Sequence, residues 1–281
     1  MKASGYVVRR SLAHGVLYVI VVLTLITMVF PLLWMISTSF KTYQTALTFP
    51  PRMIPEFLNW QSYTHVLQTS HLPRYFLNTA LYSIVGTILE VFFAILGGFV
   101  FAKYRFPGSG AFFSVILATI MIPGQVTLIP VFLILRDFHW LDTFWALIIP
   151  GIASPFGIFL IRQFGRGIPD DLIEAARIDG YPEFRILFQI FVPLCMPAIT
   201  TLAVLAFMGR WNDLFWPLIV TTSEYMGTLQ LMLTKISRSL YDIVWNELMA
   251  GMTMACIPIV IIYIAFQRYF TQGIVLTGIK G

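Results

Sequence analysis

The sequence predicts an all-α polytopic membrane protein with six transmembrane helices. Of the 281 residues, 58% are hydrophobic and 11% are charged, whereas a soluble domain needs about a quarter of its residues charged to cover its surface. Six apolar stretches have roughly the 20 residues that a helix needs to cross a bilayer. The alternating pattern of barrel strands is absent, and lipid offers no partner for free backbone amides, so we expect the spans to be helices.

The expected spans are residues 16–36, 75–102, 111–135, 143–161, 198–220 and 248–270. A basic segment precedes the first span, as in a signal peptide. The apolar run is too long for a signal-peptide core, however, and no small-residue cleavage site follows it. We therefore expect a retained helix.

Proline and glycine interrupt the third and fourth spans. Pro123, Gly124 and Pro130 fall in the third, and Pro150 and Pro155 fall in the fourth. In membranes such breaks are tolerated where neighbouring groups or a water-filled cavity satisfy the freed carbonyls, which is typical of transport pathways. Simple kinking for packing is an equally good explanation of any single break.

Lys and Arg residues are distributed unequally between the two sides of the expected membrane. With six spans, both termini lie on one side. That side carries Lys2, Arg9, Arg10, Lys103, Arg105, Arg162, Arg166, Arg177, Arg185, Arg268 and Lys280. The opposite side carries fewer, spread over longer loops, so the positive-inside rule places both termini in the cytoplasm. Basic loops facing anionic lipid account for the net charge of +5 without a nucleic-acid partner.

The residue pattern gives no sign of catalytic or metal-binding chemistry. A phosphate-binding loop needs glycines before a Lys-Ser/Thr pair, and Lys41, the one lysine followed by Ser or Thr, lacks them. The four histidines are scattered. Cys195 and Cys256 lie in or beside apolar stretches, where a reduced thiol behaves as a small hydrophobe. We expect no enzymatic activity, no metal and no cofactor bound by this chain.

Charged residues inside the expected spans indicate a candidate transport pathway. Glu90 lies deep in the second span, and Arg210 and Asp213 lie in the fifth, in GRWNDLFWPL. Each such charge costs roughly 2.5 to 3.5 kcal/mol on insertion scales. Arg210 and Asp213 are three positions apart and would share a helix face. A mutual ion pair that merely neutralises itself is therefore as good an interpretation as a polar pathway lining.

Trp211, Asn212 and Trp216 accompany these charges. Amides and flat aromatic faces suit a sugar, whose hydroxyls form hydrogen bonds and whose CH faces stack on rings. Trp216 could instead belong to an aromatic belt at the outer membrane interface. These residues therefore favour a sugar as the molecule that passes along the pathway.

The stretch PDDLIEAARIDGYPEFR, residues 169–185, holds five of the 13 acidic residues. Pro169 and the aspartates after it suit the start of a helix, and Gly180 suits its end. A helix shorter than ~12 residues is marginal alone, so we expect it to dock on another protein. Ala175 and Ala176 would allow that protein to approach closely. An ordinary polar loop is the alternative.

The segment EAARIDG, followed by FRILFQIFVPLCMP, resembles the EAA loop of permeases in binding-protein-dependent ABC importers. The matching positions are Glu174, Ala175, Ala176, Gly180, Ile190, Pro193 and Pro197. FPLLWMISTSFK, GRWNDLFWPL and the ending GIVLTGIKG are similar to the carbohydrate-uptake branch, in particular to the smaller permease of the maltose-transporter type. Tyr181 departs from the pattern, because a small residue is common after the glycine.

The resemblance implies a type I ABC importer permease fold. Residues 1–74 would form the first transmembrane helix and external loop, residues 75–270 the permease core with the EAA loop at 169–197, and residues 271–281 a cytoplasmic tail. The positions implied to couple to the ATPase are Glu174, Ala175, Ala176, Asp179 and Gly180, and in the tail Lys280 and Gly281. The implied pathway residues are those named above.

The resemblance also implies partners in the cytoplasmic (inner or plasma) membrane. These are a second, non-identical permease, two ATPase subunits that bind ATP and Mg, an extracytoplasmic solute-binding protein, and a sugar that the sequence does not name. Two alternatives stay open. One is an ion-coupled secondary sugar transporter with Glu90 and Asp213 as ion sites, and the other is an ABC permease for a non-sugar solute such as polyamine or phosphate.

Overall fold

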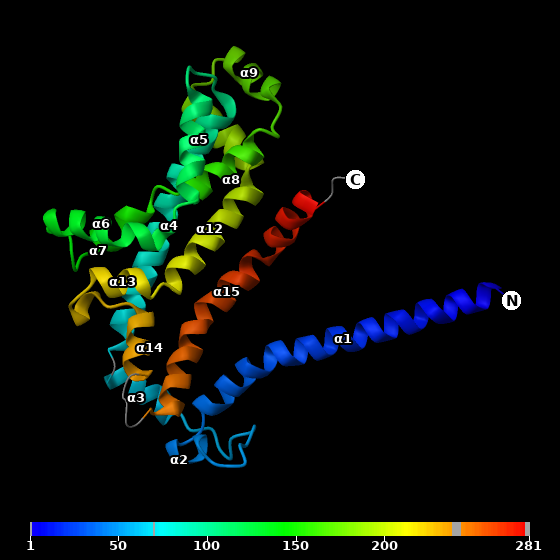
Figure 1. Cartoon of the computed structure of the whole chain (residues 1–281), viewed down its shortest axis with the longest axis vertical. Coiled ribbons are helices and arrows are strands. Elements are labelled where there is room, and N and C mark those ends of the chain that lie inside the picture. Colours follow the sequence, from blue (N-terminus) through cyan, green and yellow to red (C-terminus); the bar gives the residue numbers. More distant parts are fainter. Residues whose placement is uncertain (1, 70, 238–242, 279–281) are drawn as a thin grey trace. The chain divides into compact units, whose positions relative to one another are not determined.

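The computed structural model describes residues 2–69, 71–237 and 243–278, and the side chains of residues 14–69, 71–237 and 243–267. All regular elements in these residues are helical (Figure 1). They are α1 (Lys2–Ser39), α2 (Tyr43–Ala46), α3 (Gln61–Thr69), α4 (Leu72–Lys103), α5 (Ser109–Ile120), α6 (Gly124–Asp137), α7 (Phe144–Ile148), η1 (Ile149–Gly151), α8 (Pro155–Gly165), α9 (Asp170–Ile178), α10 (Glu183–Ile186), η2 (Leu187–Phe191), α11 (Val192–Leu194), α12 (Met196–Trp211), α13 (Phe215–Val220), η3 (Glu224–Met226), α14 (Leu229–Ser237) and α15 (Trp245–Gly278).

Three helical segments are long and apolar enough to cross a membrane by themselves: His14–Ser39 in α1, Leu72–Lys103 in α4, and Trp245–Gln267 in α15. Three further helix pairs reach the required length only together, because each pair is bent at a short break. The described residues therefore contain between three and six spans. The predicted all-α membrane class is confirmed.

The third and fifth expected spans are not continuous helices: the third is broken where the sequence predicts an interruption, and the fifth is broken where no interruption is predicted. In the third, α5 and α6 meet at 99°, where Pro123 precedes α6 with a fixed φ and no N–H to continue a helix. In the fifth, α12 ends at Trp211, and the short α13 follows separately. Pro217 explains this end, because in a continuous helix its ring would clash with the carbonyl of Asp213, four residues earlier.

The chain forms two compact units, one of residues 1–71 and 233–256, the other of residues 72–232 and 257–281. In the first unit, α3 is tied to the start of α15. The Asn246 amide donates to the Ser62 hydroxyl at 2.9 Å, and the His65 Nδ1 lies 2.9 Å from the Glu247 carboxylate. The division at residue 74 that was expected from the sequence stays a prediction.

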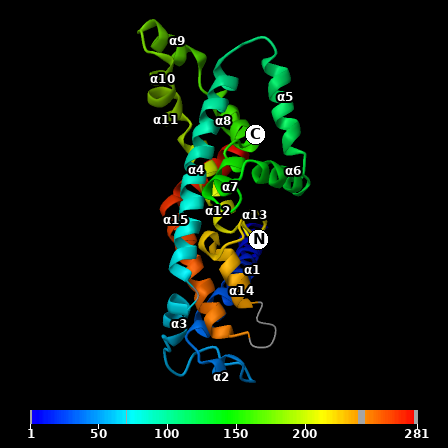
Figure 2. The same cartoon turned by 90° about the vertical axis from the view of Figure 1, so that its left-hand side faces the viewer.

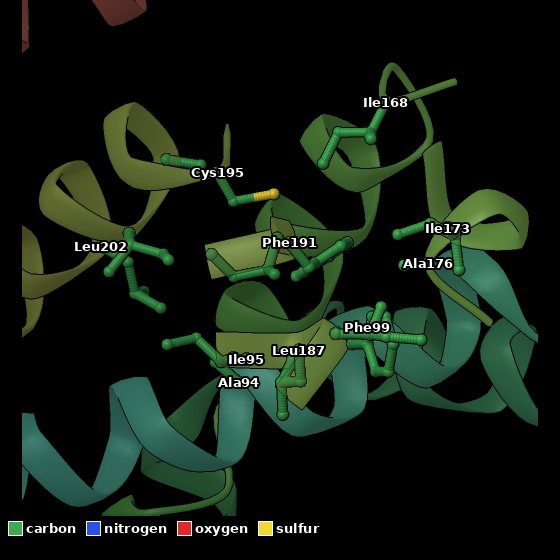
Figure 3. Packing of buried hydrophobic residues seen from close by; sticks show 14 residues of the cluster. Ala94, Ile95, Phe99, Ile168, Ile173, Ala176, Leu187, Phe191, Cys195 and Leu202 are labelled. Carbon is green, nitrogen blue, oxygen red and sulfur yellow. The ribbon is translucent and has the colours of Figure 1, made fainter. Parts of the chain in front are cut away.

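In the second unit, α4 packs along α8 and α12 (Figures 1 and 2). The contact with α8 is close at Gly98, where a Cβ atom would lie 2.5 Å from the Ile161 Cγ2. A hydrophobic core that includes Phe99, Ile161 and Phe191 fills the space where α4 and α8 meet η2 and α12. Figure 3 shows Phe99 and Phe191 among its side chains. The short helix α9, beyond one end of α4 (Figure 2), contributes to this core.

Candidate functional site

A buried ion pair joins α4 to α12. The Arg210 Nη1 donates to the Glu90 Oε2 at 2.5 Å, and each residue is only 8% exposed. A charge buried in an apolar environment needs such a partner, because desolvation is expensive. The contact holds the two helices together, and loss of either charge would leave the other buried without a partner.

Arg210 also donates a hydrogen bond to the backbone at the break in the fourth span. Its Nη2 donates to the Gly151 carbonyl at 2.8 Å, which belongs to η1 before the bend into α8. Two glycines make room for the guanidinium. A Cβ atom at Gly86 would lie 2.5 Å from the Arg210 Nε, and one at Gly151 would lie 3.2 Å from its Nη2. One side chain thus links α4, η1 and α12.

Asp213 does not pair with Arg210, so the expected shared helix face and mutual ion pair are wrong. α12 ends before Asp213, and the carboxylate accepts from the Tyr82 hydroxyl at 3.0 Å and from the Trp216 backbone N–H at 3.2 Å. The Trp216 indole Nε1 donates to the Ala146 carbonyl at 3.0 Å. Asp213 therefore fixes the turn that leads into α13.

A cavity of about 390 Å³ opens beside the ion pair. Its lining includes Tyr82, Glu90, Thr127, Gly151, Arg210 and Trp216. Two aromatic rings, a hydroxyl and a pre-formed ion pair thus face one space. This combination can form hydrogen bonds with, and stack against, a polar molecule that has apolar faces.

Two of the sequence-predicted pathway residues lie outside this cavity. Trp211 is 2% exposed and packs between Phe76 and Phe207, with ring centroids 5.3 and 5.4 Å away. Asn212 is exposed, and its amide donates to the Met208 carbonyl at 2.9 Å. The structure brings together Glu90, Arg210 and Trp216 at the cavity, with Asp213 holding Tyr82 and Trp216.

The helix in the charged stretch ends at Gly180, as the sequence predicts. α9 covers Asp170–Ile178, and Gly180 has a φ of +80°. The Gly180 N–H donates to the Arg177 carbonyl and the Tyr181 N–H donates to the Ala176 carbonyl, both at 3.0 Å. This bonding pattern is the Schellman motif, which favours glycine because other residues are strained at positive φ.

α9 has two faces. Ile173 and Ala176 are buried in the core of this chain, beside Phe99 (Figure 3). Glu174 and Ala175 are exposed. The expectation that Ala176 offers a close approach to a partner is therefore wrong, because its side chain is already buried in the core of this chain. The core of this chain itself stabilises the short helix, so its stability does not depend on an external partner alone.

Two residues that the sequence analysis did not select hold α9 to α4. The Lys103 ammonium lies 2.7 Å from the Asp170 carboxylate, and the Tyr104 hydroxyl donates to the Glu183 carboxylate. These partners are 67 and 79 positions apart in the chain. A single sequence carries no signal for such long-range pairs.

The same contacts shift the pKa values of the exposed acidic groups. The hydrogen bond from Lys103 lowers the pKa of Asp170 below its usual value. The hydrogen bond from Arg177, followed by that from Tyr104, lowers the pKa of Glu183. Both carboxylates are therefore ionised at neutral pH.

Comparison with known proteins shows the family to which the chain belongs. The model of the family described as "Binding-protein-dependent transport system inner membrane component" matches residues 94–275. The chain belongs to this family of permeases. It is 35% identical to the arabinooligosaccharides transport system permease protein AraQ of Halalkalibacterium halodurans, over 90% of this chain and 91% of that one. It is 31% identical to the lactose transport system permease protein LacG of Rhizobium radiobacter, over 94% and 96%.

A solved structure is similar to the permease over most of its length. It is the crystal structure of a bacterial ABC transporter involved in the import of the acidic polysaccharide alginate. The TM-score is 0.84 at 26% identity, and the match covers 91% of this chain and 95% of that one. The predicted type I importer fold, inner-membrane location and role as a transport subunit rather than an enzyme are confirmed.

The permease holds no cluster of His, Cys, Asp or Glu suited to a metal ion within its described residues. Its two cysteines are free. Lys280 and Gly281, implied to contact the ATPase, lie outside the described residues. Membership of the family makes the chain one component of a transport system that also requires a solute-binding protein.

Proposed function

We propose that this permease is one half of an ATP-driven importer that carries a sugar from a solute-binding protein across the cytoplasmic membrane. The cavity between α4 and α12 carries this proposal. Tyr82 and Trp216 offer aromatic surfaces for the CH faces of a sugar, and Thr127 offers a hydroxyl. The relatives named above act on arabinooligosaccharides and lactose, which supports the same class of cargo.

The alternative of a phosphate-like cargo is less well supported by the cavity. Among the described residues that line it, Arg210 is the one cation, and Glu90 already neutralises it. An ion-coupled mechanism is less well supported still, because membership of the importer family implies an ATPase as the source of energy.

In this proposal α9 is the helix that docks on the ATPase. Glu174, Ala175 and Asp179 lie on its exposed side, and the turn at Gly180 fixes where the helix stops. Ala176 supports the docking surface from within. The roles of Trp211 and Asn212 in the pathway, of Lys280 and Gly281 at the ATPase, and the cytoplasmic position of both termini stay predictions.

The proposed assembly contains a second, non-identical permease and two ATPase subunits that bind ATP and Mg. Reconstitution tests it. The permease would be co-purified with a second permease and an ATPase of the same organism, placed in proteoliposomes, and supplied with a solute-binding protein and radiolabelled oligosaccharides. We expect ATP-dependent sugar uptake that needs every component. Uptake by this permease without a second permease would reject the heterodimer, and uptake driven by an ion gradient without ATP would reject the mechanism.

A further inference from the structure

Lys103, the last residue of α4, and Tyr104, which follows it, contact opposite ends of α9. At the first end, the Lys103 ammonium donates to the Ile168 carbonyl at 2.5 Å and to the Asp170 carboxylate at 2.7 Å. The Lys103 side chain is 1% exposed. This buried side chain therefore fixes the first turn of α9 to the end of α4.

At the other end, Tyr104 is part of a three-residue network. Its hydroxyl donates to Glu183, which also accepts from the Arg177 Nε at 2.7 Å. Arg177 lies in the last turn of α9, and its guanidinium lies 5.3 Å from the Tyr104 ring centre. The network therefore holds the end of α9 and the start of α10 against α4.

Between these two contacts, α9 packs on the same helix. Ile173 and Ala176 lie in one buried cluster with Phe99 of α4. The centroid of the Phe99 ring lies 5.5 Å from that of the Tyr104 ring and 4.9 Å from that of the Phe191 ring. α9 is thus tied to the end of α4 and the residue after it at both of its own ends, and shares a buried cluster with α4 in between.

α4 also connects the end next to α9 with the polar cavity through one continuous helix. It is one helix from Leu72 to Lys103, and thirteen positions separate Lys103 from Glu90, which is about 20 Å at the helical rise of 1.5 Å per residue. The route along the chain is different. Beyond α10 it passes through the π-helical η2 and an 81° bend before it reaches α12.

We propose that α4 transmits the displacement of α9 to the Glu90–Arg210 cavity, and that Lys103 and Tyr104 are the positioning residues that join the two helices. The inference rests on the proposed function, because it assumes that an ATPase moves α9. The acidic partners Asp170 and Glu183 are solvent-exposed, with 63% and 48% of their side chains accessible, so weakening these contacts leaves no carboxylate buried without a partner. The fold should therefore stay intact. Weakening the contacts should, however, let α9 move without α4.

The test measures sugar imported per ATP hydrolysed in proteoliposomes that contain the complete transporter and its solute-binding protein. The variants are Tyr104→Phe, Lys103→Met and the two combined. Tyr181→Phe is the matched control, because Tyr181 also lies at this end and is described without a hydrogen bond from its hydroxyl. Lys103→Arg is the conservative variant that should restore the ion pair.

We expect the combined variant to retain the ATPase and to hydrolyse ATP, but to import about fivefold less sugar per ATP, the lower end of usual coupling factors. Tyr181→Phe and Lys103→Arg should keep the wild-type ratio. An unchanged ratio in the combined variant would overturn the inference, and so would loss of ATPase binding, because the contacts would then only shape the docking site. Failure of the wild-type assembly to import would instead reject the proposed function on which the inference rests.

Discussion

The Arg210 guanidinium donates a hydrogen bond of 2.5 Å to the Glu90 carboxylate within the second compact unit, although the two residues are 120 positions apart in the chain. Both side chains are buried, and the same guanidinium supports the Gly151 carbonyl at the break in the fourth span. The pair is therefore both the polar wall of the cavity and a link between three helices. Its removal is expected to affect folding and transport together.

Arg210→Met should destabilise the permease by about 3–5 kcal/mol, because it leaves the Glu90 charge buried without a partner. The combined variant Glu90→Leu with Arg210→Met should recover part of this loss, since no charge is then left buried. Thermal unfolding of the purified transporter complex measures both. A combined variant less stable than Arg210→Met would contradict the expectation.

Gly86→Ala should disturb the same ion pair without changing a charge. The added Cβ would lie 2.5 Å from the Arg210 Nε, so the Arg210 side chain must move from its present position, and its bond to Glu90 should weaken. The matched control is Gly15→Ala, on α1 and away from the cavity, where no atom lies within 4 Å of a new Cβ; there alanine favours the helix by up to about 1 kcal/mol. We expect a lower unfolding temperature and reduced import for Gly86→Ala alone. Equal behaviour of the two variants would show that the glycine is not needed for the ion pair.

Asp213→Ala should reduce import although Arg210 keeps its partner. The Tyr82 hydroxyl and the Trp216 N–H lose their shared acceptor, so both aromatic residues of the cavity become less fixed. Asn212→Ala tests the neighbouring residue, whose amide contacts only its own helix in the described structure. Normal uptake by both variants at normal expression would make this segment structural rather than part of the pathway.

Gly180→Val should weaken the attachment of the ATPase while membrane insertion is retained. A Cβ at Gly180 meets no atom within 4 Å, so the cost comes from the positive φ alone, about 1 kcal/mol or more for a β-branched residue. Gly180→Asn, which tolerates this conformation better, should retain most binding. Pull-down of the ATPase and sugar-stimulated ATP hydrolysis measure the effect.

Glu174→Lys tests the docking face separately from the turn. Glu174 is exposed on α9, so charge reversal should reduce ATPase binding without a change in permease stability. If Gly180→Val and Glu174→Lys both bind the ATPase and hydrolyse ATP normally, α9 is not the helix that docks on the ATPase.

The Glu183 contacts should persist over the physiological pH range. The hydrogen bond from Arg177 lowers the pKa of Glu183 below its usual value of 4.5. A carboxyl group with a lowered pKa stabilises the fold above its unfolded-state pKa, and this contribution disappears as the pH falls through the folded-state pKa. The difference in unfolding temperature between wild type and Glu183→Gln should therefore be constant from about pH 8 to pH 5 and shrink only below about pH 4. A difference that disappears between pH 7 and pH 6 would contradict this assignment.

Local and compositional features of this permease could be predicted from its sequence. The class follows from apolar stretches, and the end of α9 follows from Gly180, because only short-range physics is needed there. The break at Pro123 could also be seen, but the 99° angle between α5 and α6 could not. The direction of a helix after a break depends on what it packs against.

The partners of buried charges could not be predicted in the same way. Spacing pointed to Asp213 as a partner for Arg210, yet the end of α12 separates them and the packing of α4 provides Glu90 instead. Lys103 and Tyr104 resembled ordinary residues at the end of a span. Their roles depend on contacts with residues that are more than 60 positions away.

The two faces of α9 have a consequence for engineering. Ile173 and Ala176 serve the interior of this chain, whereas Leu172, Glu174, Ala175 and Ile178 point outward, Ile178 with 86% of its surface exposed. The outward residues can be exchanged for those of another transporter while the inward ones are left in place. With α9 as the proposed docking helix, a graft of this kind would redirect the permease to a different ATPase without redesigning its membrane domain.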